Sequence, residues 1–379
     1  MHVIADLTTG GAEMMMKRLI EAHEGSVQFH HHVISLRSLG RIGPELEAMG
    51  VPVEALGMRG AIEIPRVVWQ IAKRLRKIQP DVLHAWMYHA NLLGGLAARV
   101  AGVRALIWGI RATSFDATMG VSRSTTLLRR LSALASRLLP SVIVYVAYAA
   151  RAAHEKIGYA TAKGVIIPNG YQEAKSYQKE ESRLSLGIPQ DAVVIGSVGR
   201  FNEAKNPLGF VEAASLVAIH HPTAVFMMIG RQITPDNRAL TRWIDERGLT
   251  TKFCLLGEQN DLGDYYAAMD IFCLHSVTEA FPNVVAEAMS AGLPCVVTDV
   301  GDAAFLLDQG GIAVPPRSPA AIARAINELI KVGPRARERI GAIGRERINT
   351  NYSIGSVVRR YEDLYRELVE NPRVLTGRN

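Results

Sequence analysis

The stretch from His275 to Gly292 reads HSVTEAFPNVVAEAMSAG and contains two carboxylates, Glu279 and Glu287. Pro282 suits the first turn of a helix and Asn283 can cap it, which predicts a helix start with Glu279 in the preceding loop. A helix N-terminus favours phosphate or sugar oxygens, because it presents free N–H groups and the positive end of the dipole. Glu279 is then placed to bind sugar hydroxyls, and Glu287, about one turn into the helix, a ribose. The alternative is a capped surface helix with two solvated glutamates.

Length and composition indicate a soluble protein of two domains. The 379 residues are too many for one ordinary core, and 48% hydrophobic with 21% charged residues is typical of folded soluble proteins. No apolar run reaches the roughly 18 residues that a membrane-spanning helix needs, and the start of the chain lacks the basic segment of a secretion signal. We therefore expect a cytoplasmic protein in which Cys254, Cys273 and Cys295 are buried core thiols.

The net charge of +7 is concentrated in the first half of the chain. Residues 1–170 contain 20 Lys and Arg against 11 Asp and Glu, whereas the remainder contains 23 against 25. Residues 123–139 place leucines and arginines on one predicted helix, which fits an interfacial helix on an anionic membrane surface. A core-packing helix with a solvated basic face is the alternative. Nucleic acid is not expected as a partner, because no nucleic-acid-binding module is recognisable.

The first half alternates predicted strands and helices, as a parallel sheet does. The expected strands are 3–6, 32–36, 51–56, 81–86, 105–110, 142–146 and 165–167. Gly10 and Gly11 follow the first strand and open a helix, but neither the dinucleotide-binding glycine pattern nor the phosphate loop occurs there. His89 and Arg111 come after later strands. Since ligands bind beyond the carboxyl ends of parallel strands, His89 is a candidate site residue and Arg111 a partner for an anionic ligand.

The second half repeats the alternation after a turn that ends at Gly170 and a polar segment, 171–183, which suggests an exposed linker. The expected strands are 193–198, 224–229, 253–256, 271–274 and 295–298, followed by a terminal helix over 355–369. Arg200 and Lys205 lie in the loop after the first of these strands, before a helix that Asn206 caps. Two cations beside free helix N–H groups can clamp a diphosphate, unless both are solvated surface charges.

Five segments of the chain resemble the retaining GT-B glycosyltransferases of family 4, also called group 1. They are GGAE at 10–13, HAWMYHAN at 84–91, IPNG at 167–170, GRFNEAKN at 199–206 and EAFPNVVAE at 279–287. The resemblance implies an α/β protein of GT-B architecture, with two doubly wound Rossmann-like domains facing across a cleft. It implies an acceptor-binding domain over 1–170, a nucleotide-sugar-binding domain over 171–354 and a helix, 355–379, that crosses back to the first domain.

The same resemblance implies roles for single residues. It places Arg200 and Lys205 on the donor diphosphate, Glu287 on the ribose, and Glu279 with the Phe281–Asn283 backbone on the sugar. Some members carry a histidine near the reacting carbon where this chain has Ile110 or Arg111, so His89 is the candidate for the acceptor hydroxyl. The predicted catalytic residues are Arg200, Lys205, Glu279 and His89. The predicted substrate- and donor-binding residues are Gly10, Gly11, Arg111, Gly230, Arg231, Phe281, Pro282, Asn283, Val284 and Glu287.

The expected reaction is transfer of a sugar, with retention, from a nucleotide-diphosphate sugar to a lipid-linked or saccharide acceptor. A UDP-sugar in cell-surface polysaccharide or glycolipid synthesis is the specific expectation, with the enzyme in the cytoplasm or peripheral on the membrane face. Because no Asp-x-Asp pair occurs, we expect neither a metal nor another cofactor. Two alternatives remain open: a nucleotide-sugar epimerase or phosphorylase of the same fold, and a non-catalytic sugar-nucleotide-binding protein.

Overall fold

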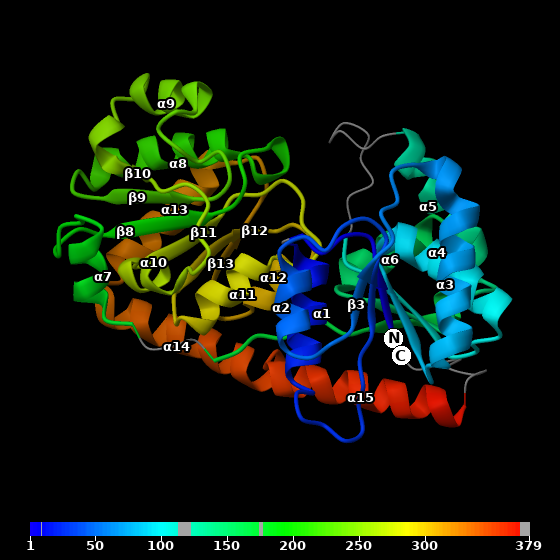
Figure 1. Cartoon of the computed structure of the whole chain (residues 1–379). Helices are drawn as coiled ribbons and strands as arrows, with labels where there is room; N and C mark the ends of the chain where they lie inside the picture. Colours follow the sequence, from blue (N-terminus) through cyan, green and yellow to red (C-terminus); the bar gives the residue numbers. More distant parts are fainter. Residues whose placement is uncertain (9, 113–122, 174–176, 372–379) are drawn as a thin grey trace. The chain divides into compact units, whose positions relative to one another are not determined.

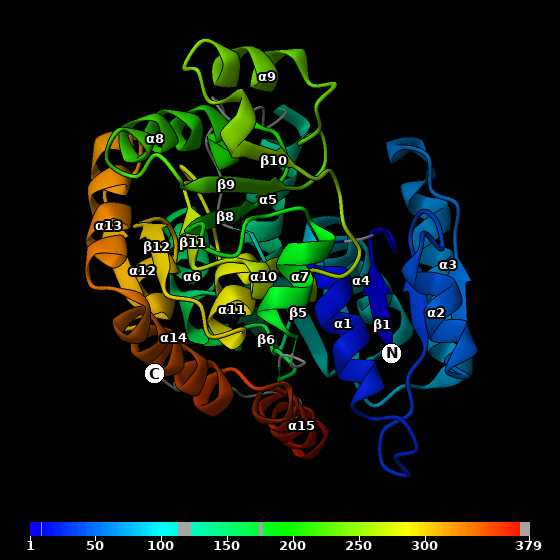
Figure 2. The same cartoon turned by 90° about the vertical axis from the view of Figure 1, so that its left-hand side faces the viewer.

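The computed structural model describes residues 1–8, 10–112, 123–173 and 177–371, without the side chains of 123–125. The chain forms two compact units (Figures 1 and 2). Unit 1 comprises Met1–Gly170 and the chain from Ile354 onward, and unit 2 comprises Tyr171–Ser353. In the described part of the chain, no helix combines the length and the apolar character needed to cross a membrane.

Unit 1 is built on a seven-stranded parallel sheet in the order β3-β2-β1-β4-β5-β6-β7. The strands are β1 (His2–Ile4), β2 (Val33–Ser35), β3 (Val53–Ala55), β4 (Leu83–Trp86), β5 (Leu106–Ile110), β6 (Val142–Tyr145) and β7 (Gly164–Ile166). The helices are α1 (Gly11–Glu21), α2 (Ile42–Ala48), α3 (Ile64–Ile78), α4 (Met87–Ala101), α5 (Arg123–Ser136), α6 (Tyr148–Lys156) and α15 (Ile354–Glu370), with short 3₁₀ turns η1 (Ala61–Glu63) and η3 (Thr161–Lys163). The chain winds outward from β1 and returns beside it as β4, so the strand order reverses between these two strands.

Unit 2 repeats this winding in a six-stranded parallel sheet of order β10-β9-β8-β11-β12-β13. The strands are β8 (Val194–Val198), β9 (Val225–Ile229), β10 (Phe253–Leu255), β11 (Ile271–Leu274), β12 (Cys295–Thr298) and β13 (Gly311–Val314). The helices are α7 (Lys179–Ser185), α8 (Pro207–His220), α9 (Arg238–Asp245), α10 (Gly263–Ala268), α11 (Asn283–Ser290), α12 (Ala303–Leu307), α13 (Pro319–Lys331) and α14 (Pro334–Asn351), with 3₁₀ turns η4 (Glu203–Lys205) and η5 (Thr250–Lys252). Figure 2 shows α8 and α13 side by side over the sheet. Both units confirm the predicted doubly wound α/β class.

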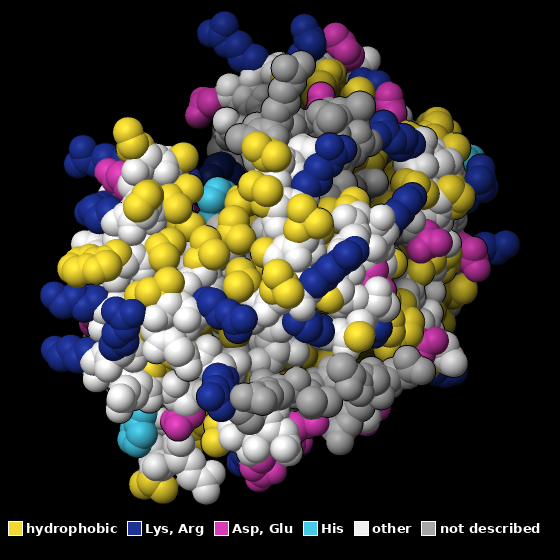
Figure 3. Space-filling view, turned by 90° about the vertical axis from the view of Figure 1, so that its right-hand side faces the viewer, with side chains coloured by type: hydrophobic (Ala, Val, Ile, Leu, Met, Phe, Trp, Pro, Cys, Tyr) yellow, Lys and Arg dark blue, Asp and Glu magenta, His cyan; other side chains and the backbone are white. Residues whose placement is uncertain are grey.

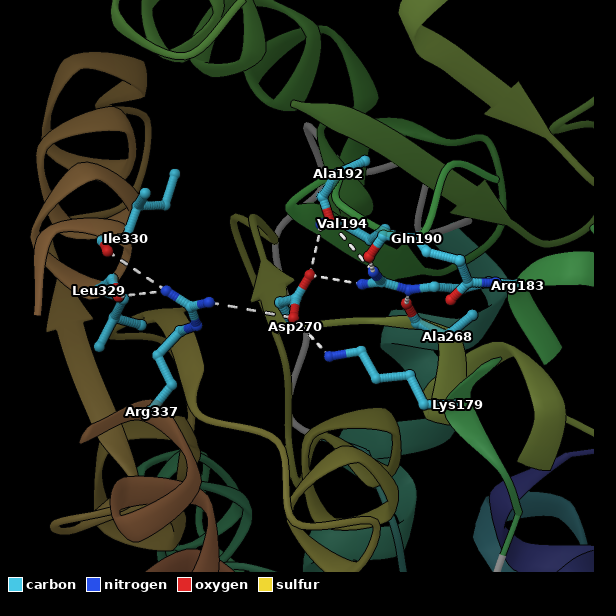
Figure 4. A network of polar contacts seen from close by, with 10 residues as sticks. All are labelled: Lys179, Arg183, Gln190, Ala192, Val194, Ala268, Asp270, Leu329, Ile330 and Arg337. Atoms are coloured by element: carbon cyan, nitrogen blue, oxygen red, sulfur yellow. Dashed lines mark hydrogen bonds and ion pairs between the residues drawn. The ribbon is translucent and has the colours of Figure 1, made fainter. Parts of the chain in front are cut away.

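A largely buried carboxylate, that of Asp270 with 9% of its side chain exposed, joins several elements at the edge of the unit 2 sheet where the strands begin (Figure 4). Its oxygens lie 2.6 Å from both the Lys179 ammonium and the Arg183 guanidinium, and accept the Val194 N–H at 2.7 Å. Arg337 lies 4.0 Å away. Burial alone would raise the pKa of Asp270, but these partners, Lys179 foremost, hold the pKa below its usual value. Asp270 therefore stays ionised and joins α7, α14 and the first strand of the unit.

The last helix, α15, belongs to unit 1 and completes its core. Tyr361 and Tyr365 are buried on it, and the Tyr365 hydroxyl lies 2.9 Å from His84 Nδ1 on β4. Tyr361 accepts a hydrogen bond from Arg111. The amphipathic pattern of the terminal segment thus reflects burial against the first half of the chain.

Two expectations about the second half are wrong in part. The segment 171–183 is not an exposed linker throughout, because Tyr171 is buried and α7 buries Ser182 and Arg183. Arg183 is buried because its guanidinium donates to the carbonyls of Ala268, Gln190 and Ala192 as well as to Asp270. Residues 174–176 of that segment lie outside the described residues. Of the three free cysteines, Cys273 and Cys295 are buried, whereas Cys254 on β10 is only half-buried.

Candidate active site

The candidate site lies in unit 2, where β8 and β11 are neighbouring strands and the strand order reverses. The loop after β8 carries Arg200 and Lys205, and the loop after β11 carries Glu279. Parallel strands place both loops at the same edge of the sheet, which is where doubly wound folds bind ligands. The loops are joined directly, because the Val277 N–H donates to the Ala204 carbonyl at 2.8 Å.

Lys205 and Glu279 form the centre of the site. The Lys205 Nζ lies 2.5 Å from Glu279 Oε1, and the same oxygen accepts the Ser276 hydroxyl at 2.6 Å. Only 21% of the lysine side chain and 12% of the glutamate side chain are exposed. Asn202 caps the turn η4 by accepting the Lys205 N–H at 3.0 Å, which fixes the lysine backbone. These contacts exclude the solvated-surface alternative for both residues.

Arg200 lies on the rim of the same site. It is exposed and has no hydrogen-bond or ion-pair partner among the residues the structure describes. Together with Lys205, His275 and Ser276 it lines a small cavity at the ends of β8 and β11. The predicted pair of cations therefore borders one cavity, with Lys205 held by Glu279 and Arg200 available to a ligand.

His275, directly after β11, holds the loop that carries Lys205. Its Nδ1 lies 3.1 Å from the Asn206 carbonyl, which can only accept, so Nδ1 carries the proton and Nε2 accepts the Ser197 hydroxyl at 2.6 Å. The ring stacks on Phe210, and burial lowers the pKa of His275 to about 4. A neutral imidazole thus holds Asn206, whose side chain caps α8 as predicted by accepting the Gly209 N–H. Sequence reasoning gave His275 no role, although its place directly after a buried strand was a usable signal.

The helix start in the 275–292 stretch differs from the prediction by one residue. Pro282 precedes α11 with an extended backbone, and Asn283 is the first helical residue and not the cap. The Asn283 side chain instead accepts the Tyr171 hydroxyl at 2.5 Å. Phe281 is buried between Tyr171 and Tyr352, with ring centroids 6.4 and 5.7 Å away. The first turn of α11 begins directly after the Glu279 loop, with Val284 in it, so its N–H groups are placed for an anion.

Glu287 lies about one turn into α11 and is half-buried. Its Oε2 accepts the hydroxyl of Tyr266, on α10, at 3.3 Å. Burial, and then the negative charge of Glu287, raise the pKa of Tyr266 well above its usual value, so the phenol stays protonated and donates. The carboxylate is therefore oriented by a neighbouring helix and is not a freely solvated group.

Two glycines allow the loops of the site to pass close together. Gly230 has φ +146°, and a Cβ there would lie 2.1 Å from the Gly199 carbonyl oxygen. Gly301 has φ +58°, and a Cβ there would lie 2.4 Å from the Glu279 carbonyl oxygen. A side chain at either position would displace a loop that carries a site residue. Arg231, next to Gly230, forms an exposed ion pair with Glu258 at 3.2 Å.

The candidate residues of unit 1 lie at the corresponding edge of its own sheet. Gly10 and Gly11 start α1 after β1, and His89 lies in the first turn of α4 after the neighbouring β4. His89 is exposed at the surface, and its pKa is lowered by partial burial and by the charge of Arg37. Arg111 is engaged within unit 1: it donates to Asn169 at 2.5 Å and to Tyr361, and lies over the Trp86 ring.

Two glycosyltransferase family models match the chain, one over each half. Residues 178–347 match the family model described as glycosyl transferases group 1, and residues 9–175 match glycosyltransferase family 4. The chain is a group 1 glycosyltransferase. Its two doubly wound units are those of the GT-B fold, which confirms the resemblance seen in the sequence.

Relatives of this glycosyltransferase extend over most of its length. The Escherichia coli UDP-Gal:alpha-D-GlcNAc-diphosphoundecaprenol alpha-1,3-galactosyltransferase is 27% identical over 309 residues, covering 79% of this chain and 78% of that protein. The lipopolysaccharide core biosynthesis glycosyltransferase LpsD of Rhizobium meliloti is 24% identical over 364 residues, covering 94% and 95%. The solved structure of Anabaena Alr3699/HepE in complex with UDP superposes with a TM-score of 0.83 at 19% identity, covering 97% of this chain and 100% of that one. That structural likeness concerns the fold.

Proposed function

We propose that this glycosyltransferase moves a sugar, with retention and without a metal, from a UDP-sugar to a lipid-linked or saccharide acceptor in cell-surface polysaccharide or glycolipid synthesis. The observation that carries the proposal is the contact of Lys205 with Glu279 at the β8–β11 reversal, with Arg200 on the same cavity. The name of the Escherichia coli relative, which specifies UDP-Gal and a diphosphoundecaprenol-linked sugar, supports the donor and acceptor classes. The UDP bound to HepE supports the nucleotide.

In this proposal the cations act on the leaving group. Breaking the bond between the sugar C1 and the diphosphate builds negative charge on the phosphate oxygens. Fixed positive charges at that position therefore stabilise the transition state more than the bound substrate. Lys205 and Arg200 supply these charges, and the first turn of α11 adds N–H groups. When the donor binds, Lys205 exchanges part of its contact with Glu279 for the phosphate, which frees the carboxylate for sugar hydroxyls.

The remaining donor contacts follow from the same edge of the sheet. Glu287, held by Tyr266, accepts hydrogen bonds from the ribose hydroxyls. The backbone of Phe281 and Asn283 faces the sugar beside Glu279. The Gly230–Arg231 turn, at the end of the neighbouring strand β9, completes the donor pocket on the side of the nucleotide.

Retention is proposed to occur by attack from the face that the leaving group occupies. The bond from C1 to the phosphate oxygen breaks, a bond from C1 to the acceptor oxygen forms, and the acceptor proton passes to the departing phosphate. No separate base or carboxylate nucleophile is then needed. Unit 1 binds the acceptor, with His89 and the Gly10–Gly11 turn at the ends of adjacent strands, and His89 contacts the acceptor hydroxyl.

The proposal is tested by incubating the enzyme with radiolabelled UDP-sugars and either a polyprenyl-diphosphate saccharide or a free saccharide. Transfer of label to one acceptor, with release of UDP and an α-linked product from an α-linked donor, is the expected result. An epimerase would convert the UDP-sugar into its epimer without an acceptor, with no net release of UDP and no new glycosidic bond to an acceptor. A phosphorylase would require inorganic phosphate for the reverse cleavage of its product, and a binding protein would release no UDP in any mixture.

We predict that excess EDTA leaves the transfer rate unchanged, because Arg200 and Lys205 supply the positive charge that a divalent ion supplies elsewhere. The measurement is the initial rate before and after exhaustive treatment with the chelator. An activity that EDTA abolishes and Mn²⁺ restores would overturn the metal-independent mechanism and leave the donor site in place.

A further inference from the structure

Three neighbouring helices of unit 1 contain basic residues and no acidic ones. Helix α4 packs between α3 and α5 (Figure 1). Helix α3 contains five Lys or Arg, α4 one and α5 three, and none of the three contains Asp or Glu. A solvated surface of a soluble domain normally mixes both signs of charge, so the complete absence of carboxylates from three adjacent helices requires an explanation.

The same helices expose large apolar side chains in a regular array. On α5 and the turn after it, Leu127, Leu131, Leu134 and Leu138 are 59%, 47%, 65% and 77% exposed. Their spacing of three and four residues places them on one stripe. Leu96 and Val100 on α4 and Trp69 on α3 are also exposed. Figure 3, which looks onto this side of unit 1, shows apolar side chains gathered across the face with Lys and Arg between them.

Some cations of this face are already paired or buried, and others are exposed without a carboxylate partner in the described part of the chain. Arg66 and Arg74 pair with Glu63 and Glu54, and Arg129 is buried over the Tyr88 ring. The exposed cations that lack a carboxylate partner among the described residues are Lys73, Arg76, Lys77, Arg99, Arg130 and Arg137. Lys73 lies over the Trp69 ring with its ammonium 5.4 Å from the centroid. Positive charge therefore remains uncompensated around the apolar stripe.

We propose that the α3–α5 face docks on a bilayer of anionic phospholipid, with the α5 leucines and Trp69 at the level of the headgroups and the cations on the lipid phosphates. An aliphatic stripe flanked by lysine and arginine is the chemistry of an interfacial helix. A nucleic-acid surface is disfavoured, because such interfaces are polar and gain little from exposed leucines. This proposal rests on the proposed function, in which unit 1 binds a lipid-linked acceptor. Docking of the α3–α5 face brings unit 1 to the membrane that contains such an acceptor.

The test measures binding of the full chain to vesicles, without turnover, so that it stands apart from the proposed reaction. Sedimentation is compared for vesicles of phosphatidylcholine and of phosphatidylcholine with phosphatidylglycerol. We expect binding to the anionic vesicles only, a decrease of at least about tenfold in L131E/L134E, and about fivefold for each of Arg130→Ala and Arg137→Ala. The matched control is Ile219→Glu on α8 of unit 2, which is 71% exposed and should bind like wild type.

Trp69 supplies a second readout that needs no variant in α5. It is the one exposed tryptophan of the four in the chain, so anionic vesicles should shift its fluorescence to the blue, and Trp69→Phe should remove the shift. The proposal is overturned if wild type ignores anionic vesicles, if L131E/L134E binds as wild type does, or if Ile219→Glu loses as much. Binding to heparin that equals vesicle binding and is insensitive to L131E/L134E would assign the face to a soluble polyanion instead.

Discussion

At the scale of single residues, unit 2 holds paired charges at both edges of its sheet for different purposes. Asp270, where the strands begin, is neutralised by Lys179 and Arg183 in contacts that nothing in the proposed reaction disturbs. Glu279, where the strands end, is paired with Lys205 beside a cavity and next to a helix start. The first arrangement stabilises the fold, and the second can be exchanged for a ligand.

We predict that Asp270→Asn lowers the free energy of unfolding of unit 2 by about 3–5 kcal/mol, because the buried Arg183 guanidinium loses its counter-ion. Urea unfolding of wild type and variant measures the change. The matched control is Glu246→Gln, which breaks an exposed ion pair with Arg242 and should cost less than about 1 kcal/mol. Equal effects of the two substitutions would show that the buried network contributes no more than a surface pair.

Charge and position after a strand predict which side chains gather at this edge of the sheet better than they predict its local geometry. Arg200, Lys205 and Glu279 all follow strands, and the structure places Lys205 against Glu279 and Arg200 on the same cavity as Lys205. Asn283 was predicted as a helix cap, because asparagine favours that position, but the Tyr171 hydroxyl binds its side chain. That competitor lies 112 residues earlier in the chain, so no local pattern could reveal it.

At the scale of elements, the loop before α11 contacts both points where the chain passes between the two units. Tyr171 is the first residue of unit 2 and Tyr352 is next to its last, and the Tyr171 N–H donates to the Tyr352 carbonyl at 2.9 Å. Phe281 stacks on the Tyr171 ring and lies tilted against the Tyr352 ring, and Asn283 accepts the Tyr171 hydroxyl. The proposed sugar-binding loop is therefore supported by the two connecting segments of the chain.

We predict that Tyr171→Phe raises the KM for the donor about two- to tenfold with a smaller change in kcat, since one hydrogen bond that orients Asn283 is lost. Initial rates at varied donor concentration measure both constants. Tyr177→Phe is the control, because its hydroxyl donates to Asp261, away from the loop, and its constants should not change. An unchanged donor KM in Tyr171→Phe would contradict a role for this contact in binding.

Elements with a strong hydrophobic pattern were predicted closely, and short polar elements were missed. The terminal helix predicted over 355–369 lies within α15, and the long central strands of both sheets lie within a few residues of their predicted positions. The sequence predicts a linker where α7 lies, because KEESRLS has almost no apolar residues. The helix is partly buried because Arg183 donates to the Ala268 carbonyl and the Asp270 carboxylate, which lie 85 and 87 residues later in the chain. Local periodicity cannot reveal partners so distant in sequence.

At the scale of the whole molecule, the two units differ in how many buried histidines they contain. In unit 1 the Trp86 N–H donates to His2 Nδ1, so His2 carries its proton on Nε2 and donates to His31 at 2.9 Å. By the same reasoning, His31 donates from Nε2 to His23 Nδ1, and His23 donates from Nε2 to the Glu362 carboxylate on α15. This chain of neutral rings joins β1, the turn after α1 and the last helix.

We predict that acidification destabilises unit 1 more than unit 2. Burial lowers the pKa of His31 to about 3, that of His154 to about 4, and those of His2 and His84 well below the usual value, whereas the described part of unit 2 has one such histidine, His275. Below about pH 6.5 the unfolded chain binds protons that the folded units exclude, so the free energy of unfolding falls as pH falls toward the folded pKa values.

The loss should reach about 1 kcal/mol for each buried histidine between about pH 7.5 and 5.5. The protein is unfolded in urea at the two pH values, and each sample is pulse-labelled by hydrogen exchange at one fixed pH. The peptides of each unit then give the urea midpoint of that unit. A larger shift for unit 2, or no shift for either, would contradict the proposed neutral histidines.

The most direct test of the account is the kcat/KM of Lys205→Ala and Arg200→Ala for the sugar donor, with Arg242→Ala on α9 as an exposed control. We predict that each of the first two substitutions lowers kcat/KM by about a hundredfold or more, as loss of one transition-state donor does, while the control is unchanged and all three variants melt as folded proteins. Turnover like that of wild type in both Lys205→Ala and Arg200→Ala would contradict it.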